Sequence, residues 1–338
     1  MQVPEEDTPM LAVCIDETGA LFLKHVPRPE LRDAQLLIKV TATALNRADL
    51  LQKRGLYQPA HGESQILGLE ASGVIDAIGP GVKGNWKLGS EVMALLSGGG
   101  YAEYVAVPEE LVMPVPSHLT LYQAAAIPET WLTAYQLLHF IAKVKPNETV
   151  LIHAGASGVG TAAIQLVRLG RAVPIVTAGS PEKLQFTEQL GAALGINYKE
   201  DNFSEKVLQF TEGRGADIIL DCIGGSSWEK NVSSLALDGR WVLYGALGGK
   251  TVDGDLLGKL LRKRGHLLCT LLRSRSLQYK AELVRSFTEQ VLPLFKSTDS
   301  PLCPVIDSTF NMEDIEKAHR HMEENQNIGK IIIKIGSS

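Results

Sequence analysis

The sequence predicts an α/β protein with two domains, one rich in β structure and one built on a doubly wound parallel sheet. Three observations support this prediction. The chain has 338 residues, which is more than one hydrophobic core usually holds. Short strand-like runs separated by glycine and proline fill the part before residue 115. From residue 150 onwards, strand patterns alternate with helix patterns.

The β-rich part begins at Met10. Apolar runs typical of strands occupy residues 11–15, 35–40, 71–78 and 91–95, and glycine-rich turns at 79–81 and 98–100 separate them. Short strands punctuated in this way predict a barrel or a sandwich. Residues 1–9 are acidic and contain proline, so we expect a disordered lead-in rather than a signal or transit peptide.

The alternating part follows a linking region at residues 114–128 and a predicted helix at 131–141. Strands are predicted at 150–154, 173–177, 217–221, 241–244 and 267–272, with helices at 181–190, 203–210 and 228–235. This alternation is typical of a parallel sheet with helices on both faces. A helix at 313–323 and a strand at 331–335 fit the β-rich part better. We therefore expect one discontinuous domain of residues 10–127 and 287–338, interrupted by a nucleotide-binding domain of residues 128–286.

The most informative motif is HAGASGVG at residues 153–160, because it lies between a predicted strand and a predicted helix. Turn glycines let the backbone approach a pyrophosphate closely, and a helix start supplies free N–H groups and a partial positive charge. The motif departs from the usual G-x-G-x-x-G pattern, since a serine takes the place of the second glycine. It predicts a Rossmann domain that binds a dinucleotide through Gly155, Ser157, Gly158, Val159 and Gly160.

The end of the second strand predicts which dinucleotide binds. NAD-selective sites usually carry an acid there, which accepts a hydrogen bond from the ribose 2′-hydroxyl. This chain instead has Gly179 and Ser180, followed by Lys183. A carboxylate would repel a 2′-phosphate, whereas a serine and a lysine would hold it, so the sequence predicts NADPH. The alternative, that Lys183 is an ordinary surface lysine, stays open at this stage.

Charge and composition disfavour several classes of function. The net charge is −5, from 33 basic and 38 acidic residues, so nucleic acid is not expected as a partner. No apolar run approaches the roughly 20 residues of a membrane helix. The four cysteines, Cys14, Cys222, Cys269 and Cys303, form no CxxC pair, which argues against structural zinc and a disulfide scaffold. The cytoplasm is the expected compartment.

The β-rich domain, the HAGASGVG turn and the missing acid together resemble the medium-chain dehydrogenase/reductase family. Within it, ALNRADL (44–50), ILGLEASG (66–73) and the glycine turn resemble the zinc-free quinone oxidoreductase branch, and residues 220–245 resemble its vertebrate members. The resemblance implies a GroES-like catalytic domain beside the Rossmann domain. It implies NADPH-dependent reduction of quinones and a homodimer paired through the strand at 241–244. It also connects the chain with reactive oxygen species in stress and apoptotic signalling, which no residue encodes.

Zinc alcohol dehydrogenases of this family carry a metal-binding histidine beside the equivalent of Glu70, and a cysteine earlier in the domain. Here Leu69 precedes Glu70, and ALNRADL contains no cysteine. Zinc ligands would therefore not converge, and no metal is expected. Without a Lewis acid, an electron-poor quinone is a better acceptor than a simple carbonyl. His319 and His321 are expected at the surface, since residues two apart on a helix point in different directions.

Further site residues follow from the resemblance alone. It places Asn46 and Tyr57 beside the nicotinamide as the candidate catalytic residues, with groups that can donate to a developing oxyanion. The alternatives are a turn-stabilising amide and an ordinary half-buried aromatic ring. Cofactor contacts are implied for Asn46, Thr133, Tyr198, Cys222, Ile223, Gly224, Gly245, Leu247, Leu271, Leu272 and Arg273, and for Asn325 at the 2′-phosphate.

Two other functions stay open. The same fold could reduce the activated carbon–carbon double bond of a conjugated enone. Alternatively, the protein could bind NADPH as a regulatory or structural module with little turnover. A small-molecule quinone is the expected substrate, and the sequence does not identify which quinone.

Overall fold

The computed structural model describes residues 9–60, 62–295 and 300–336, so nearly all of the expected lead-in at 1–9 lies outside the described residues. The chain divides into unit 1, Met1–Leu132 with Ser276–Ser338, and unit 2, Thr133–Arg275. The second junction precedes the expected one at residue 287. Helix α9 (Leu277–Gln290) explains the difference, because Lys280 donates to Ser97 of unit 1 and the whole helix stays with that unit.

Unit 2 contains a six-stranded parallel sheet in the order β10-β9-β8-β11-β12-β13. The strand order reverses direction between β8 and β11, which is the switch point where doubly wound sheets bind ligands. The predicted Rossmann topology is thus confirmed. The strands are β8 (Thr149–Ile152), β9 (Val173–Ala178), β10 (Leu194–Asn197), β11 (Ala216–Asp221), β12 (Leu235–Leu243) and β13 (His266–Cys269).

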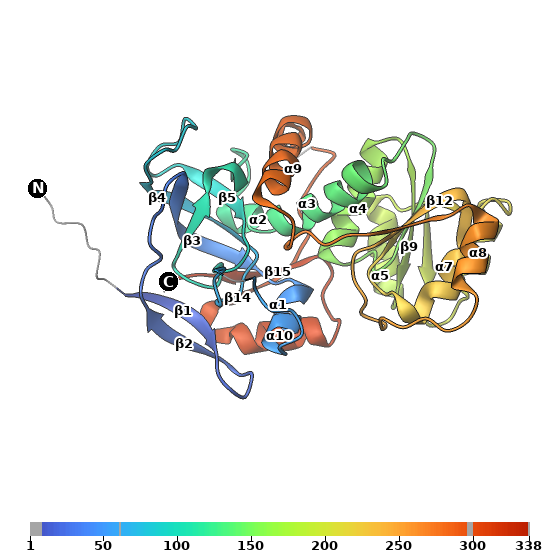
Figure 1. Ribbon diagram of the computed structural model, residues 1–338, viewed down its shortest axis with the longest axis horizontal. Coiled ribbons are helices and arrows are strands. Elements are labelled where there is room, and N and C mark those ends of the chain that lie inside the picture. Colours follow the sequence, from blue (N-terminus) through green and yellow to red (C-terminus); the bar gives the residue numbers. More distant parts are fainter. Residues whose placement is uncertain (1–8, 61, 296–299, 337–338) are drawn as a thin grey trace, which may run out of the picture. The chain divides into compact units, whose positions relative to one another are not determined.

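Helices cover both faces of this sheet. Figure 1 shows α4 and α5 on one face and α7 and α8 on the other. Apolar side chains fill the space between sheet and helices, among them Leu151, Ile219 and Trp241, which are at most 2% exposed. The helices are α4 (Gly158–Leu169), α5 (Pro181–Leu190), α6 (Phe203–Phe210), α7 (Trp228–Ser234) and α8 (Leu256–Lys263).

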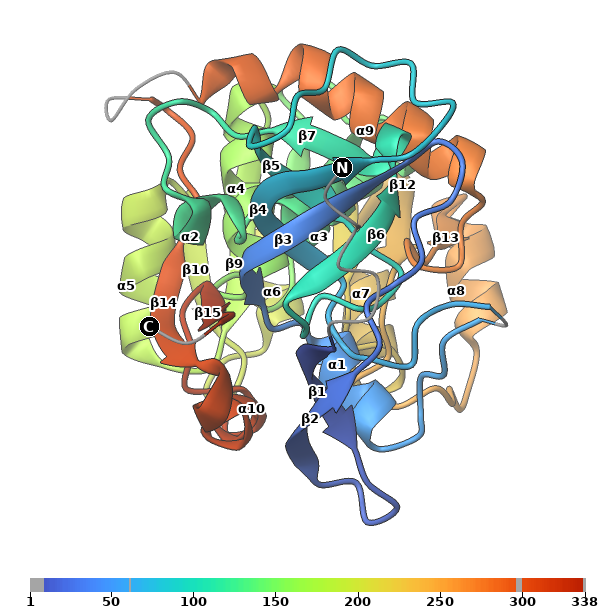
Figure 2. The ribbon, with the colours of Figure 1, turned by 90° about the vertical axis from the view of Figure 1, so that its left-hand side faces the viewer.

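Unit 1 is built on a seven-stranded sheet in the order β14-β15-β3-β4-β5-β7, with β6 also paired to β3. Figure 2 shows β3, β4 and β5 side by side, with β14 and β15 beyond β3. A separate hairpin is formed by β1 (Met10–Ile15) and β2 (Leu21–Val26). The sheet strands are β3 (Gln35–Ala44), β4 (Glu70–Ile78), β5 (Glu91–Leu95), β6 (Tyr104–Pro108), β7 (Val112–Pro114), β14 (Ile306–Asn311) and β15 (Lys330–Lys334).

The antiparallel pairing of β15 with β3 brings the end of the chain beside its beginning. Helix α1 (Arg47–Lys53) follows β3 directly, and β4 begins at Glu70, so three segments distant in sequence meet at one end of the sheet. The remaining helices of this unit are α2 (Leu121–Ala124), the start of α3 (Pro128–Tyr135), α9 and α10 (Ile315–Glu323).

One expected feature of the Rossmann sheet is wrong. The resemblance implies a dimer paired through the strand at 241–244, which would need a free edge, but these residues fall in and just after β12, which pairs with β11 on one side and β13 on the other. The described edge strands of this sheet are β10 and β13. Within the described ranges, no helix has the length and apolar character needed to cross a membrane.

Candidate functional site

The glycine-rich corner connects β8 to α4 as predicted. Ser157 is the N-cap of α4, and its side-chain oxygen accepts a hydrogen bond from the Gly160 N–H at 3.0 Å. Helix geometry leaves the N–H groups of Gly158 and Val159 without intrahelical partners. The helix start therefore offers backbone donors and the positive end of its dipole to an anion.

Two glycines of this corner are required by close packing. A Cβ atom on Gly160 would collide with the carbonyl oxygens of Ala154 and Gly155. A Cβ atom on Gly155 would lie 2.6 Å from the Cβ of Val176 in β9. These contacts match the roles of the first and last glycines in a dinucleotide fingerprint, so the corner fits a pyrophosphate.

The carboxyl ends of β9 and β10 bring the predicted 2′-phosphate residues together. Ser180 caps α5 and accepts from the Lys183 N–H at 3.4 Å. A Cβ atom on Gly179 would lie 2.8 Å from the Tyr198 hydroxyl and 3.1 Å from Cε of Lys199. Tyr198 and Lys199 thus lie over the turn that follows β9.

Sequence reasoning missed Lys199, although it follows Tyr198 directly at the end of β10. The rule that ligands bind at the carboxyl ends of parallel strands would have selected it, had β10 been recognised. Lys199 is exposed and Lys183 is half-buried. Two lysines, a serine and a tyrosine are residues that can hold a phosphate.

The turn after β11 is shaped by a buried carboxylate. Asp221 is fully buried, and its Oδ1 accepts from the N–H groups of Ile223 at 2.7 Å and Gly224 at 3.1 Å. The Leu247 N–H donates to the Cys222 carbonyl at 3.0 Å, and Gly245 packs against Cys222. The structure therefore gathers these predicted cofactor residues at the carboxyl ends of β11 and β12.

A buried polar network extends from Asp221 to the glycine-rich corner. Oδ2 of Asp221 accepts from Asn231 at 3.0 Å and from the Trp241 indole at 2.9 Å. Nε2 of His153 lies 2.7 Å from Oδ1 of Asn231, and its Nδ1 lies 2.9 Å from the Thr177 hydroxyl. Burial lowers the pKa of His153, so the ring is neutral at pH 7. The network joins β8, β9, β11, β12 and α7 behind the cofactor edge.

The remaining predicted contacts of unit 2 lie on two neighbouring segments. Thr133 belongs to α3 and is 9% exposed. Gln136, in the π-helical turn after α3, donates to the Thr270 hydroxyl at 3.3 Å, just before Leu271. Leu272 and Arg273 follow and are both buried, whereas Leu271 is exposed.

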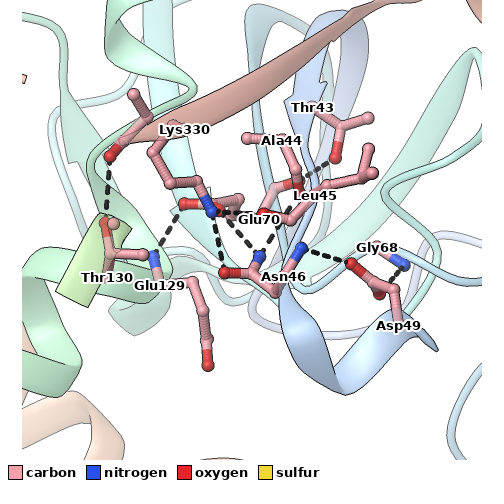
Figure 3. Close-up of polar contacts among 12 residues, drawn as sticks. Thr43, Ala44, Leu45, Asn46, Asp49, Gly68, Glu70, Glu129, Thr130 and Lys330 are labelled. Carbon is pink, nitrogen blue, oxygen red and sulfur yellow. Dashed lines mark hydrogen bonds and ion pairs between the residues drawn. The ribbon is translucent and has the colours of Figure 1, made fainter. Parts of the chain in front are cut away.

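In unit 1, Asn46 is a buried residue at the N-cap of α1. Its side-chain nitrogen donates to Oε1 of Glu70 at 2.8 Å and to the Ala44 carbonyl at 3.3 Å. Its side-chain oxygen accepts from Nζ of Lys330 at 2.7 Å. Figure 3 shows the carboxamide held between these partners. These are the contacts of a turn-stabilising amide, which was the alternative to a catalytic role.

Lys330 and Glu70 form an ion pair in the interior of unit 1. The two side chains are 4% and 0% exposed, and Nζ lies 2.8 Å from Oε1 of Glu70. The ammonium also donates to the Leu45 carbonyl at 2.6 Å. Oε2 of Glu70 accepts from the Glu129 N–H at 2.8 Å. Glu70 therefore connects β4 with β15, the start of α1 and the start of α3 (Figure 3).

Asp49 is the second buried carboxyl group near Asn46. It accepts from the Asn46 N–H at 2.8 Å, the Gly68 N–H at 3.2 Å and the Tyr101 hydroxyl at 3.2 Å. Burial outweighs these hydrogen bonds and raises the pKa of Asp49 to about 6.

The expectation that His319 lies at the surface is wrong. His319 is fully buried, and its Nε2 lies 3.2 Å from the Tyr101 hydroxyl. It shares the inner face of α10 with Ile315, Ala318 and Met322, which follow helical spacing. Burial lowers the pKa of His319 to about 3, so the ring is neutral in the folded protein.

The last two predicted residues lie at the surface of unit 1 or near it. Tyr57 is half-buried in the loop after α1. Asn325 follows α10, and its side-chain oxygen accepts from Arg47 at 2.9 Å. Among the described residues, no group of three or more His, Cys, Asp or Glu side chains is arranged to hold a metal ion.

Comparisons with known proteins agree with this architecture. Residues 32–117 match the family described as alcohol dehydrogenase GroES-like domain, and residues 158–289 match the family described as zinc-binding dehydrogenase. Synaptic vesicle membrane protein VAT-1 homologs from Danio rerio and Homo sapiens are 32% and 30% identical over 319 and 315 residues. The matches cover 90% and 89% of this chain, and 65% and 79% of those proteins. The chain belongs to the medium-chain dehydrogenase/reductase family.

Solved structures similar to this chain include an enoyl reductase and a quinone oxidoreductase, which are named for different substrates. The CurK enoyl reductase has a TM-score of 0.85 and 27% identity, over 97% of this chain and 99% of that one. A mycobacterial quinone oxidoreductase has a TM-score of 0.80 and 26% identity, over 96% and 99%. As a medium-chain dehydrogenase/reductase, the protein is an oxidoreductase, and this family uses a nicotinamide cofactor.

The close packing of Gly160 generates a first prediction. Gly160→Ala forces the turn apart, so we expect a loss of about 1–3 kcal/mol in stability and at least about tenfold weaker binding of the nicotinamide cofactor. Denaturant unfolding and fluorescence titration measure the two effects. Gly170→Ala is the matched control, since its Cβ would sit at an ordinary 3.5 Å from the nearest carbonyls of the same helix. Equal affinity of both variants for the nicotinamide cofactor would contradict the role of the corner.

The buried His319 generates a second prediction. Its folded-state pKa of about 3 lies below the ordinary histidine value of 6.5, so its stabilising effect is complete above pH 6.5 and is lost as pH falls towards 3. This one group contributes a slope of at most about 1.4 kcal/mol per pH unit to the free energy of unfolding. His319→Gln cannot gain the charge, so its stability should decline less over that range. Parallel plots of unfolding free energy against pH for the two proteins would contradict this, because they would show that His319 gains its proton as readily in the folded state as in the unfolded state.

Proposed function

We propose that the protein is an NADPH-dependent quinone oxidoreductase that works without a metal, as in the zinc-free branch of its family. The observation that carries the cofactor choice is the carboxyl edge of β9 and β10. There Ser180, Lys183, Tyr198 and Lys199 surround a glycine turn, and no acid stands at the end of β9. Such a set suits a 2′-phosphate and not the free ribose hydroxyl of NADH.

Independence from zinc is supported by the donor set around Glu70. Its two carboxylate oxygens already accept from Lys330, Asn46 and the Glu129 N–H. The ammonium group of Lys330 lies beside the Glu70 carboxylate, and the apolar Leu69 precedes Glu70 in the chain. This environment does not suit a zinc ion, which needs several unengaged nitrogen, sulfur or oxygen ligands.

In this proposal, separate groups of residues bind the cofactor, contact the acceptor and hold the backbone in place. The start of α4 binds the pyrophosphate, and the turn residues 222–224 and 245–247 border the ribose and the nicotinamide. Tyr57 remains a candidate donor to the acceptor oxygen, while the network around Asn46 holds the start of α1 in place. When bound, NADPH supplies the hydride.

A second candidate is reduction of a conjugated enone, which the similarity to an enoyl reductase favours. Quinones and enones are both electron-poor conjugated carbonyl compounds, so neither needs a Lewis acid. The rate of NADPH oxidation, measured with a panel of ortho-quinones, para-quinones and enones, tests both candidate functions. Turnover of enones alone would overturn the quinone proposal. NADPH binding without turnover of any acceptor would favour a regulatory or structural role.

The lysines at the phosphate edge generate a third prediction. Lys183→Glu and Lys199→Glu each replace attraction by repulsion, so the KM for NADPH should rise about tenfold or more while the KM for NADH changes little. Lys206→Glu, which alters the net charge equally from helix α6, is the control. An unchanged ratio of the two KM values in either variant would remove that lysine from the site.

We also propose a homodimer formed through the edge strand β13 and helix α8. Leu257 and Leu261 of α8 are 75% and 77% exposed, and Leu267 of β13 is 38% exposed. Exposed leucines beside an unpaired strand edge are typical of an interface. The proposed compartment is the cytoplasm, because all four cysteines are free thiols. A role in generating reactive oxygen species during stress or apoptosis rests on the family resemblance alone.

This interface generates a fourth prediction. Leu261→Glu places a charge in the proposed contact and should convert the dimer into monomers, as measured by sedimentation velocity. Leu88→Glu, at a leucine of unit 1 that is 67% exposed, should leave the mass unchanged. A wild-type protein that sediments as a monomer would overturn the proposal.

A further inference from the structure

Glu129 is a titratable residue of unit 1 to which the site described above assigns no chemical role. It is the second residue of α3, and its N–H donates to Oε2 of Glu70 at 2.8 Å. This bond ties the backbone of Glu129 to the buried ion pair. Figure 3 shows that the side chain points away from Glu70 and Lys330. Among the described residues, its carboxyl group has no hydrogen-bond partner.

The other ionisable groups of this cluster are already engaged. Glu70 is paired with Lys330, and Asp49 is enclosed by two backbone N–H groups and the Tyr101 hydroxyl. The ammonium of Lys330 has three acceptors. Glu129 differs from them because it is half-buried and, in the part of the chain that the structure describes, its carboxyl group is not engaged in a hydrogen bond.

Charged groups from four elements act on Glu129. Glu70 of β4 and Asp49 of α1 disfavour its ionisation, whereas Lys330 of β15 and Lys280 of α9 favour it. Burial and the Glu70 charge prevail and raise the pKa of Glu129 to about 8. The carboxyl group therefore holds a proton at pH 7.

Reduction of a quinone or an enone needs such a proton. Hydride transfer gives the acceptor two electrons and one hydrogen and leaves a negative charge on an oxygen that was a carbonyl. A neutral acid beside the acceptor can remove this charge as it develops. Buried carboxylic acids with raised pKa values are suited to this task at neutral pH.

We propose that Glu129 is the general acid of the reduction and protonates the acceptor oxygen that becomes negative on hydride transfer. This inference rests on the proposed function. The O–H bond of Glu129 breaks and an O–H bond forms on the acceptor, which leaves a Glu129 carboxylate. Solvent returns the proton to that carboxylate, so each hydroquinone formed consumes one NADPH and one proton. With an enone, the enol formed by the same step rearranges to the saturated ketone.

Glu129→Gln tests the proposal, because glutamine keeps the shape of the side chain and has no transferable acid proton. We expect kcat with the best acceptor to fall by about 10²–10⁴-fold, with an unchanged Kd for NADPH. Glu129→Asp retains the acid and should recover part of the loss. Glu91→Gln, at an exposed glutamate of the same unit, should behave as the wild type. Circular dichroism confirms that each variant is folded.

The pH dependence gives a second readout. The acid must be protonated to act, so the wild-type rate should be maintained below pH 8 and fall about tenfold per pH unit above it. Glu129→Gln should lack this fall. In the protein without NADPH, infrared difference spectra should show a carboxylic acid C=O band that disappears as pH rises through 8, and Glu129→Gln should lose that band.

The outcomes separate the inference from the function on which it rests. An active wild type together with an equally active Glu129→Gln variant would overturn the role of Glu129 and leave the reductase proposal standing. A wild type that reduces no quinone and no enone would overturn both. An infrared band that has already disappeared at pH 6 would show that Glu129 is ionised at neutral pH and cannot act as the acid.

Discussion

The buried ion pair between Lys330 and Glu70 is the interaction on which the interior of unit 1 depends. It lies where three strands and two helix starts meet, and its hydrogen bonds reach each of them. Two charges are costly to remove from water, and this pair is tolerated because both charged groups are hydrogen-bonded to further partners. Loss of either partner would leave an unpaired charge in the interior. The position of Asn46 and the start of α3 both follow from this pair.

In unit 2, a buried carboxylate is stabilised by hydrogen bonds rather than by an ion pair. Asp221 is fully buried and has no ion-pair partner among the residues that the structure describes, and four N–H donors from the turn, Asn231 and Trp241 satisfy its oxygens. Charge-assisted hydrogen bonds of this kind are strong in a low-dielectric interior. The turn after β11 is thereby held in one conformation before any ligand arrives. Both units thus fix their local backbone from within, through buried carboxylates that are hydrogen-bonded to several segments of the chain.

Sequence reasoning succeeded where structure follows from neighbouring residues. The glycine corner, the helix starts at Gly158 and Pro181 and the doubly wound topology all follow from local patterns, and they are present as expected. It failed where the signal is short or distant. The strand β10 has only four residues, so Lys199 was overlooked. Lys330, Glu129 and His319 acquire their environments from contacts between distant parts of the chain, as shown by the bonds of Lys330 to Leu45 and of His319 to Tyr101. No pattern of residue spacing in the sequence predicts these contacts.

The order of residues along the chain gives the buried ion pair a consequence for biosynthesis. Glu70 leaves the ribosome early, whereas Lys330 arrives only after the entire Rossmann unit has been made. Until then, strand β15 is missing from its place beside β3, and Glu70 has no ammonium to neutralise it. A nascent chain can therefore complete unit 2 while unit 1 still lacks strand β15. Unit 1, which contains the ion pair, is therefore the last of the two units to be completed.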